Sequence, residues 1–233
     1  MRQILYSGFE SLNIPFSDEM YGRFKKYYDC LTAKNNVMNL TAITGEENTA
    51  RLHFLDCAAL CSIYDFSGAS VIDIGTGAGF PGLPLKIVKP DISLVLLDSH
   101  KKRVAFLTEV CHELGFEDVK CISERAEDLA PDIGGSFDVA VSRAVARLNI
   151  LCEFCMPFIH VGGVFIAMKG PDWSEELKEA SNAISFLGGA SPEIKKYNIP
   201  GTDIFHSAVI IKKVKKTPDG YPRQFGRIKK SPL

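Results

Sequence analysis

The stretch Val71-Ile72-Asp73-Ile74-Gly75-Thr76-Gly77-Ala78-Gly79-Phe80-Pro81-Gly82 decides the fold of this chain, because an apolar strand runs directly into a glycine-rich turn. Gly75, Gly77 and Gly79 allow the backbone to turn sharply at the carboxyl end of a strand and to approach a ligand closely. A second apolar run, Leu94-Val95-Leu96-Leu97, ends at Asp98, at the spacing where a carboxylate meets the vicinal hydroxyls of an adenosine ribose. The sequence therefore predicts a nucleotide-cofactor site, and an ordinary buried strand followed by a glycine turn is the alternative.

The spacing of the glycines argues against a dinucleotide cofactor. A dinucleotide fingerprint has the form Gly-x-Gly-x-x-Gly, whereas here the glycines fall at every second position and Phe80 takes the slot of the third. Pro81 and Pro84 also remove backbone N–H groups that a pyrophosphate would use at the start of the next helix. A cofactor without phosphate fits better, and Asp73 could anchor an amino-acid ammonium. The set resembles the first two motifs of S-adenosylmethionine-dependent methyltransferases.

Strand and helix patterns alternate from residue 69 onward, which predicts a parallel sheet covered by helices on both faces. Only residues 198–204 separate the last two strands, too few for a helical crossover, so we expect that pair to be antiparallel. Residues 1–66 show helical periodicity, including a helix after Ser17 and a short one with a capping box at Thr44 and Glu47. The predicted strands cover 70–74, 93–98, 119–123, 137–142, 163–168, 193–197 and 205–213, and the predicted helices between them start near 83, 101, 149 and 173.

The predicted fold is thus α/β, with a doubly wound, mostly parallel, seven-stranded sheet and an N-terminal helical cap. We assign residues 1–66 to the cap, 67–213 to a cofactor-binding domain and 214–233 to a basic tail.

Composition favours a reduced, cytoplasmic protein of 233 residues with 46% hydrophobic and 24% charged side chains. No charged leader precedes an apolar run, and the most apolar region, 150–168, is interrupted by polar residues, so we expect neither a signal peptide nor a membrane segment. Seven cysteines, an odd number, suggest free thiols, and Cys152-x-x-Cys155 reads as part of an apolar helix. The five histidines show no ligand spacing, so no metal site is expected.

Charge is unevenly distributed along the chain. Residues 212–233 hold eight Lys and Arg against one acidic residue, a net charge of +7, whereas the rest of the chain holds 19 basic against 27 acidic side chains, a net charge of −8. This asymmetry suggests a basic segment that binds an anion, with nucleic acid as the obvious candidate and a solvated end as the alternative. Because the segment lies far from the glycine turn in sequence, we expect its removal to spare cofactor binding.

Several short segments between about residue 35 and the end of the chain match the motifs of one known family. They are Asn39-Leu40-Thr41, His53-Phe54-Leu55-Asp56, the stretch from Asp73 to Gly82, Asp98-Ser99, Lys102-Arg103, Arg125-Ala126-Glu127, Ser142-Arg143-Ala144, Met168-Lys169-Gly170, Tyr221-Pro222-Arg223 and Lys230-Ser231-Pro232-Leu233. Together they resemble the RsmG (GidB) family of small-subunit ribosomal RNA guanine-N7 methyltransferases. The resemblance implies a Rossmann-like class I methyltransferase fold, S-adenosyl-L-methionine as cofactor, and ribosomal RNA or the small ribosomal subunit as partner.

The resemblance also implies roles for individual residues. Arg143 is the candidate catalytic residue, and Lys169, Arg223, Lys229 and Lys230 are candidate substrate-binding residues. Glu127 and Arg143 have a structural alternative, since either could simply pair with a neighbouring charge. The candidate cofactor-binding residues are Gly75, Gly77, Gly79, Phe80, Asp98, Ser99, His100, Ala126, Glu127 and Arg143.

The chemistry needs little beyond orientation, because guanine N7 offers a lone pair and carries no proton to remove. Two other functions keep the same motifs: a non-catalytic ribosome-assembly factor that binds S-adenosylmethionine and RNA, and a methyltransferase that acts on a small molecule. Turnover distinguishes the first from an enzyme, and the basic segment argues against the second. We further expect a monomer with no membrane and no metal partner.

Overall fold

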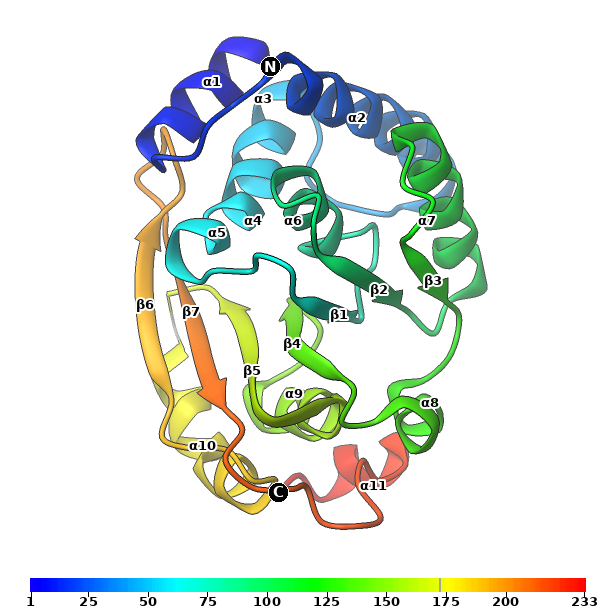
Figure 1. Cartoon of the computed structure of the whole chain (residues 1–233), viewed down its shortest axis with the longest axis vertical. Helices are drawn as coiled ribbons and strands as arrows, with labels where there is room; N and C mark the ends of the chain where they lie inside the picture. Colours follow the sequence, from blue (N-terminus) through cyan, green and yellow to red (C-terminus); the bar gives the residue numbers. More distant parts are fainter. Residues whose placement is uncertain (172) are drawn as a thin grey trace.

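A seven-stranded β-sheet runs through the middle of the molecule (Figure 1). The computed structural model describes residues 1–171 and 173–233. The strand order is β3-β2-β1-β4-β5-β7-β6; the first five strands of the chain pair in parallel, and β7 pairs antiparallel with β5 and β6. The predicted mostly parallel sheet with an antiparallel end is confirmed. The strands are β1 (Ser70–Ile74), β2 (Ser93–Leu97), β3 (Lys120–Ile122), β4 (Phe137–Arg143), β5 (Ile159–Lys169), β6 (Glu193–Asn198) and β7 (Phe205–Lys212).

Alternate residues of the strands enter two separate hydrophobic cores, one on each face of the sheet. Val71 of β1 belongs to the core on the first face, and its neighbour Ile72 belongs to the core on the second. Leu96 and Leu97 of β2 divide in the same way. The near-continuous apolar runs in the sequence reflect this burial on both faces.

The helices that precede β3 cover the first face and occupy the upper half of Figure 1. Helix α2 begins where the Ser17 side chain accepts a hydrogen bond from the Met20 amide, as an N-cap residue should. The helices of this layer share one core with the sheet, and the division between a cap and a cofactor domain at residues 66 and 67 stays a prediction. The layer contains α1 (Arg2–Ser11), α2 (Asp18–Met38), α3 (Glu46–Thr49), η1 (Ala50–Leu55), α4 (Asp56–Ala58), α5 (Leu60–Ile63), α6 (Gly82–Val88) and α7 (Lys101–Leu114).

The capping box predicted at Thr44 and Glu47 is wrong. Helix α3 begins at Glu46, so Gly45 is its N-cap residue, and no side chain caps the helix. Thr44 lies one residue too early to cap and instead accepts a hydrogen bond from the Asn48 side chain through its carbonyl oxygen.

The helices that follow β3 cover the second face and occupy the lower half of Figure 1. The helix predicted over 149–158 ends earlier than expected, at Cys155, because a 3-10 turn that contains Pro157 follows it and β5 already begins at Ile159. The sequence did not predict α8 or α11. The layer contains α8 (Ala126–Ile133), α9 (Leu148–Cys155), η2 (Met156–Phe158), α10 (Trp173–Phe186) and α11 (Phe225–Lys230).

The basic C-terminal segment, residues 214–233, packs against this second layer. Ile228 of α11 is fully buried, and the Tyr221 ring meets Phe186 of α10 with 5.1 Å between the ring centroids. Figure 1 shows α11 close to α8 and α9. The segment predicted as a tail is therefore part of the folded body.

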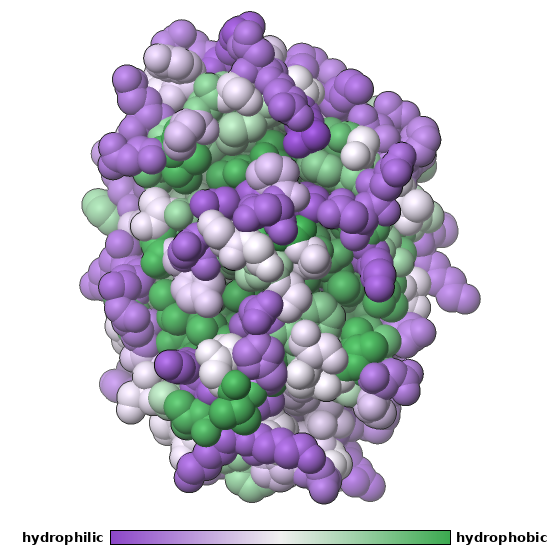
Figure 2. Space-filling model, viewed as in Figure 1, coloured by the Kyte–Doolittle hydropathy of each residue, from purple (hydrophilic) through white to green (hydrophobic). Residues whose placement is uncertain are grey.

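The surface seen in the same view carries hydrophilic side chains around its rim and groups of hydrophobic ones over its middle (Figure 2). Within the described part of the chain, no helix has the length and apolar character needed to cross a membrane.

Candidate functional site

A crevice opens at the carboxyl ends of the parallel strands, where ligands bind in open α/β sheets. It consists of two adjoining cavities, which we call the first cavity, of about 320 Å³, and the second cavity, of about 460 Å³. Both are lined by Gly75, Asp98, Ser99, His100 and Val145. The loops after β1, β2 and β4 thus supply the surface that the two cavities share.

The glycine turn after β1 needs its glycines for different reasons. Gly75, Gly77 and Gly79 have φ values of +70°, +61° and +105°, which side chains disfavour. A Cβ atom on Gly75 would lie 2.5 Å from a methyl group of Val145, and one on Gly79 would lie 2.7 Å from the Tyr27 hydroxyl oxygen. A Cβ atom on Gly77 would meet no atom within 4 Å. Gly77 therefore faces the open crevice, where a ligand can approach the backbone.

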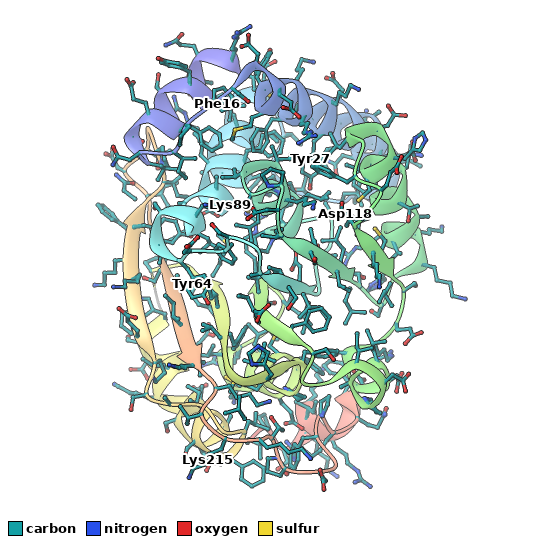
Figure 3. All side chains as sticks on the ribbon, in the orientation of Figure 1. Phe16, Tyr27, Tyr64, Lys89, Asp118 and Lys215 are labelled. Carbon is teal, nitrogen blue, oxygen red and sulfur yellow. The ribbon has the colours of Figure 1, made fainter. Side chains whose placement is uncertain are left out.

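Tyr27 of α2 supports this turn from the first helix layer. It lies on the inner side of α2, as labelled in Figure 3, and its hydroxyl donates a 2.6 Å hydrogen bond to the Ala78 carbonyl oxygen. Its ring also stacks on Phe80, with centroids 5.4 Å apart. A residue of the first helix layer thus helps to hold the glycine turn in place.

Asp73 holds the same turn from beneath. Its side chain is fully buried, and one carboxylate oxygen accepts hydrogen bonds from the Thr76 hydroxyl and the Gly82 amide, both at 2.7 Å. Within the described residues the other oxygen, Oδ1, has no partner. Burial raises the pKa of Asp73 to about 7 although these hydrogen bonds oppose the rise. The contact between Asp73 and an ammonium group stays a prediction.

Asp98 joins the turn to the end of β2. One oxygen accepts a 3.1 Å hydrogen bond from the Gly77 amide, and the other accepts one of 2.8 Å from the His100 amide. Arg103 lies 3.4 Å from the carboxylate. Because Asp98 is nearly buried yet lines both cavities, its carboxylate is fixed where the two cavities meet.

The first cavity has apolar walls and a polar edge. Apolar side chains from four elements and the loop after β4 line it, namely Ile74, Leu97, Val145, Phe154 and Phe225. Ala126 and Glu127, both predicted from the sequence, lie at its edge. Phe225 was not predicted, because it follows Glu127 by 98 residues and no local pattern connects the two; its amide donates a 3.2 Å hydrogen bond to Glu127 Oε1.

Arg143 stands at the end of β4 and lines the second cavity. Its guanidinium contacts Asp56 Oδ2 at 3.2 Å and His53 Nδ1 at 2.7 Å. It also lies 4.8 Å above the centre of the Phe80 ring, on which His53 stacks with 4.1 Å between centroids. Arg143, Phe80, Asp56 and His53 thus form one cluster, and the roles of Arg143 and Phe80 in the site stay predictions.

His53 is neutral in this arrangement. Burial, and then the nearby guanidinium of Arg143, lower the pKa of His53 to about 3. Because arginine only donates, Nδ1 of His53 accepts from Arg143, and Nε2–H donates to the Thr41 hydroxyl oxygen at 2.8 Å. The environment therefore fixes the tautomer of His53.

A third cavity, of about 470 Å³, shares His53, Arg143 and Ala144 with the second cavity. The fully buried Asp56 lies at its floor and accepts 2.9 Å hydrogen bonds from the Tyr197 hydroxyl and from His206 Nδ1. The remaining wall is mostly apolar and comes from the cap, β5 and the β6–β7 turn. Asp56 stands in a motif quoted above but was given no role in the site, and His206 was not singled out; the two are 150 residues apart in the chain.

The candidate substrate-binding residues lie in different places. Lys169 donates to Glu176 Oε2 at 2.6 Å and lines the third cavity. Arg223 forms an ion pair with the buried carboxylate of Glu153, whereas Lys229 and Lys230 are exposed on α11. Their contacts with substrate stay predictions. Within the described residues, no group of three or more His, Cys, Asp or Glu side chains could hold a metal ion.

Comparison with known proteins identifies the family. The family model GidB, described as rRNA small subunit methyltransferase G, matches residues 20–204. A protein of Clostridium botulinum (strain 657 / Type Ba4) named ribosomal RNA small subunit methyltransferase G is 47% identical over 99% of this chain and 98% of its own length. A protein of the same name from Clostridium perfringens (strain 13 / Type A) is 46% identical over 96% of this chain and 95% of its own.

Solved structures share the fold at low identity. A SAM-dependent methyltransferase from Aquifex aeolicus matches with a TM-score of 0.54 and 17% identity, over 72% of this chain and 94% of that one. TrmN from Thermus thermophilus matches with a TM-score of 0.57 and 18% identity, over 77% of this chain and 53% of that one. The sheet order, the glycine turn and the sequence relatives lead to one conclusion: the chain is an S-adenosylmethionine-dependent methyltransferase that belongs to the rRNA small subunit methyltransferase G (GidB) family.

Proposed function

We propose that this enzyme methylates N7 of a guanine in small-subunit ribosomal RNA. The observation that carries the proposal is the third cavity, which adjoins the cofactor crevice and shares Arg143 and His53 with it. A nucleobase in that cavity would lie directly beside the cofactor. The names of the relatives support ribosomal RNA as the substrate.

The residues of the crevice fit S-adenosylmethionine. Gly77 leaves its backbone open to a ligand, Asp98 presents a fixed carboxylate to ribose hydroxyls, and the first cavity offers apolar walls with Glu127 at the edge for an adenine ring. The remaining part of the second cavity, toward Arg143, would hold the methionine end. When bound, the cofactor supplies an electrophilic methyl group on a sulfonium.

The groups near the third cavity suit a reaction that needs no general base. His53 is neutral, with a pKa of about 3. It is still no general base, because its Nδ1 accepts a hydrogen bond from Arg143 and its Nε2 donates one to Thr41, which leaves no free lone pair. Guanine N7 has no proton to lose, and its attack on a methyl group requires alignment only. Arg143 and His53, held by the buried Asp56 and Phe80, form a rigid wall that orients the base.

The shape of the third cavity suits a purine removed from its stack. Met168, Ile199 and Ile204 supply apolar surface for the faces of the ring, and His206 supplies a polar group at the margin. Enzymes that modify a base in RNA or DNA read it in such a pocket, away from its neighbours. The exposed Lys229 and Lys230 would contribute to binding of the RNA backbone by a monomeric, cytoplasmic enzyme.

The test is methylation of small-subunit ribosomal RNA, prepared without the modification, by the purified protein and labelled S-adenosylmethionine. After digestion to nucleosides, mass spectrometry should find the label in 7-methylguanosine. Gly77→Val, which places a branched side chain in the crevice at a positive φ, should abolish it. Label in another nucleoside would overturn guanine N7. Cofactor binding without turnover on RNA or the small subunit would instead favour an assembly factor, and turnover on small acceptors alone would favour a small-molecule enzyme.

A further inference from the structure

We propose that Phe225 is an adenine-binding residue of the cofactor site and that Arg223 is the residue that positions it. This inference concerns the cofactor and does not depend on which nucleotide is methylated. Four observations support it. Phe225 lines the first cavity, it lies at the end of the crevice away from Arg143, its amide hydrogen-bonds to Glu127, and the Arg223–Glu153 ion pair holds its segment in place.

Phe225 contributes an aromatic wall to the first cavity. The residue is 41% exposed, and its ring contacts that of Phe154 of α9 with 6.1 Å between centroids. A half-exposed phenylalanine next to an apolar cavity leaves hydrophobic surface that a flat ligand can cover. Stacking on an aromatic side chain is the usual way in which proteins bind the face of a nucleobase.

The position of Phe225 selects one end of the cofactor. The first cavity contains Phe225 and Glu127 but not Gly77 or Arg143, which line the second. Asp98, which suits the ribose, lies where the two cavities meet. The ring of Phe225 is therefore placed at the adenine end, away from the methyl group that is transferred.

Phe225 also orients the polar edge of the same cavity. Its backbone amide donates a 3.2 Å hydrogen bond to Glu127 Oε1, the carboxylate that the proposed function places at the edge of the adenine ring. The amino group of adenine needs an acceptor, and Glu127 Oε2 is the oxygen that this hydrogen bond leaves available. One residue thus supplies a stacking surface and orients the hydrogen-bonding partner.

Arg223 anchors the segment two residues before Phe225. Its Nε donates to Glu153 Oε1 and its Nη2 donates to Glu153 Oε2, both at 2.7 Å. Its backbone amide also donates to Oε1, at 2.9 Å. Glu153 is fully buried on α9 and directly precedes Phe154, the residue that Phe225 contacts. This bidentate pair determines where the segment lies on α9 and therefore where the Phe225 ring stands.

The experiment measures binding of S-adenosylhomocysteine and of adenosine to the full-length protein by calorimetry, without RNA. Phe225→Ala should raise the Kd for S-adenosylhomocysteine about tenfold, and the Kd for adenosine by the same factor, because the ring contacts only the part that both share. Phe225→Trp, which keeps an aromatic wall, should stay within about twofold of the original protein. The matched control is Phe205→Ala, at an exposed phenylalanine of β7 that lines none of the three cavities.

Two results would overturn the role of Phe225: an unchanged Kd for S-adenosylhomocysteine in Phe225→Ala, or a loss for S-adenosylhomocysteine with none for adenosine. Arg223→Ala should also weaken adenosine binding, but adding it to Phe225→Ala should cause little further loss, since Arg223 acts through the ring. Additive losses would show that Arg223 does not act by positioning Phe225. Neither outcome bears on the proposed methylation of guanine N7, because that proposal is tested separately by methyl transfer to RNA.

Discussion

Arg143 illustrates how a single side chain can serve the site and the fold together. It is the cation beside Asp56, whose carboxylate is fully buried at the meeting point of the cap and the sheet. Its guanidinium also covers Phe80 and fixes the ring of His53. Removal of Arg143 would therefore leave the buried carboxylate of Asp56 without its cation, and Phe80 and His53 without the group that packs against them.

We therefore expect Arg143→Ala to abolish methyl transfer and also to lower the free energy of unfolding by about 3 kcal/mol, because Asp56 would remain as a buried charge without its cation. Urea denaturation measures the second effect. Arg147→Ala is the matched control: this arginine is more than half exposed and pairs with the exposed Glu179, so its loss should change stability by less than about 1 kcal/mol. Equal losses in the two variants would contradict a buried ion pair at Arg143.

His53 and Asp73 should impose opposite pH dependences on stability. The pKa of His53 falls to about 3 on folding, so below its unfolded pKa of 6.5 the unfolded chain binds the extra proton and stability rises with pH between about 3 and 6.5. The pKa of Asp73 rises from 3.8 to about 7, so the folded state binds the extra proton and stability falls as pH rises through that range. Over most of this range the two effects oppose each other.

Unfolding free energies measured between pH 4 and 6.5 separate them. Relative to the original protein, His53→Gln should lose about 1.4 kcal/mol of stability per unit rise in pH, and Asp73→Asn should gain about as much. Slopes of the same sign in the two variants would contradict the protonation states assigned to these residues.

At the scale of elements, the sequence did not predict α11, and its position changes the expected effect of removing the C-terminal segment. The sequence predicted that removal of the basic segment spares cofactor binding. The structure instead places Phe225 in the wall of the first cavity and the fully buried Ile228 in the second core. We expect truncation after Lys213 to weaken S-adenosylhomocysteine binding and to lower the unfolding midpoint, since a buried isoleucine alone contributes about 2 kcal/mol or more. Calorimetry measures the Kd for S-adenosylhomocysteine, and thermal denaturation measures the unfolding midpoint. An unchanged Kd would show that the segment takes no part in cofactor binding.

The strands and the glycine turn could be predicted because their signals are local. The apolar runs at 70–74 and 93–97 and the glycines between them determine β1, β2 and the turn with few alternatives. Helices α8 and α11 have only eight and six residues, and α8 contains Pro131. Helices of that length are marginal on their own, so both depend on packing against α9. The early start of β5 follows from pairing with β4, which no single segment reveals.

The site divides in the same way. Gly77 and Asp98 follow predicted strands, and their position at the carboxyl edge follows from the topology. Asp56, His206 and Phe225 come from separate parts of the chain and meet only through tertiary packing. A single sequence gives no signal for such meetings.

At the scale of the whole molecule, the charge asymmetry predicted from the sequence is only partly available to a partner. Lys213 is buried, its ammonium donates to the carbonyl oxygens of Met156 and Ile159, and burial lowers its pKa to about 8. Arg223 is committed to Glu153. Exposed cations of α11 such as Lys229 and Lys230 are better placed to reach RNA phosphates.

We expect the double substitution Lys229→Ala/Lys230→Ala to reduce the slope of log Kobs against log salt by about 1.4, the counterion release of two phosphate contacts on single-stranded RNA. Fluorescence anisotropy of ribosomal RNA fragments at several salt concentrations measures the slope. Lys178→Ala, an exposed lysine of α10, is the control and should leave it unchanged. If both variants keep the original slope, the RNA docks on another face.

The hydrogen bond from Tyr27 to the Ala78 carbonyl has a consequence for local opening of the protein. Tyr27 is fully buried between α2 and the glycine turn, so α2 cannot separate from the turn without breaking that bond and the stacking on Phe80. Amide hydrogens of α2 and of the turn should therefore exchange with deuterium as one cooperative unit, and a ligand that holds the turn should slow exchange in α2 as well.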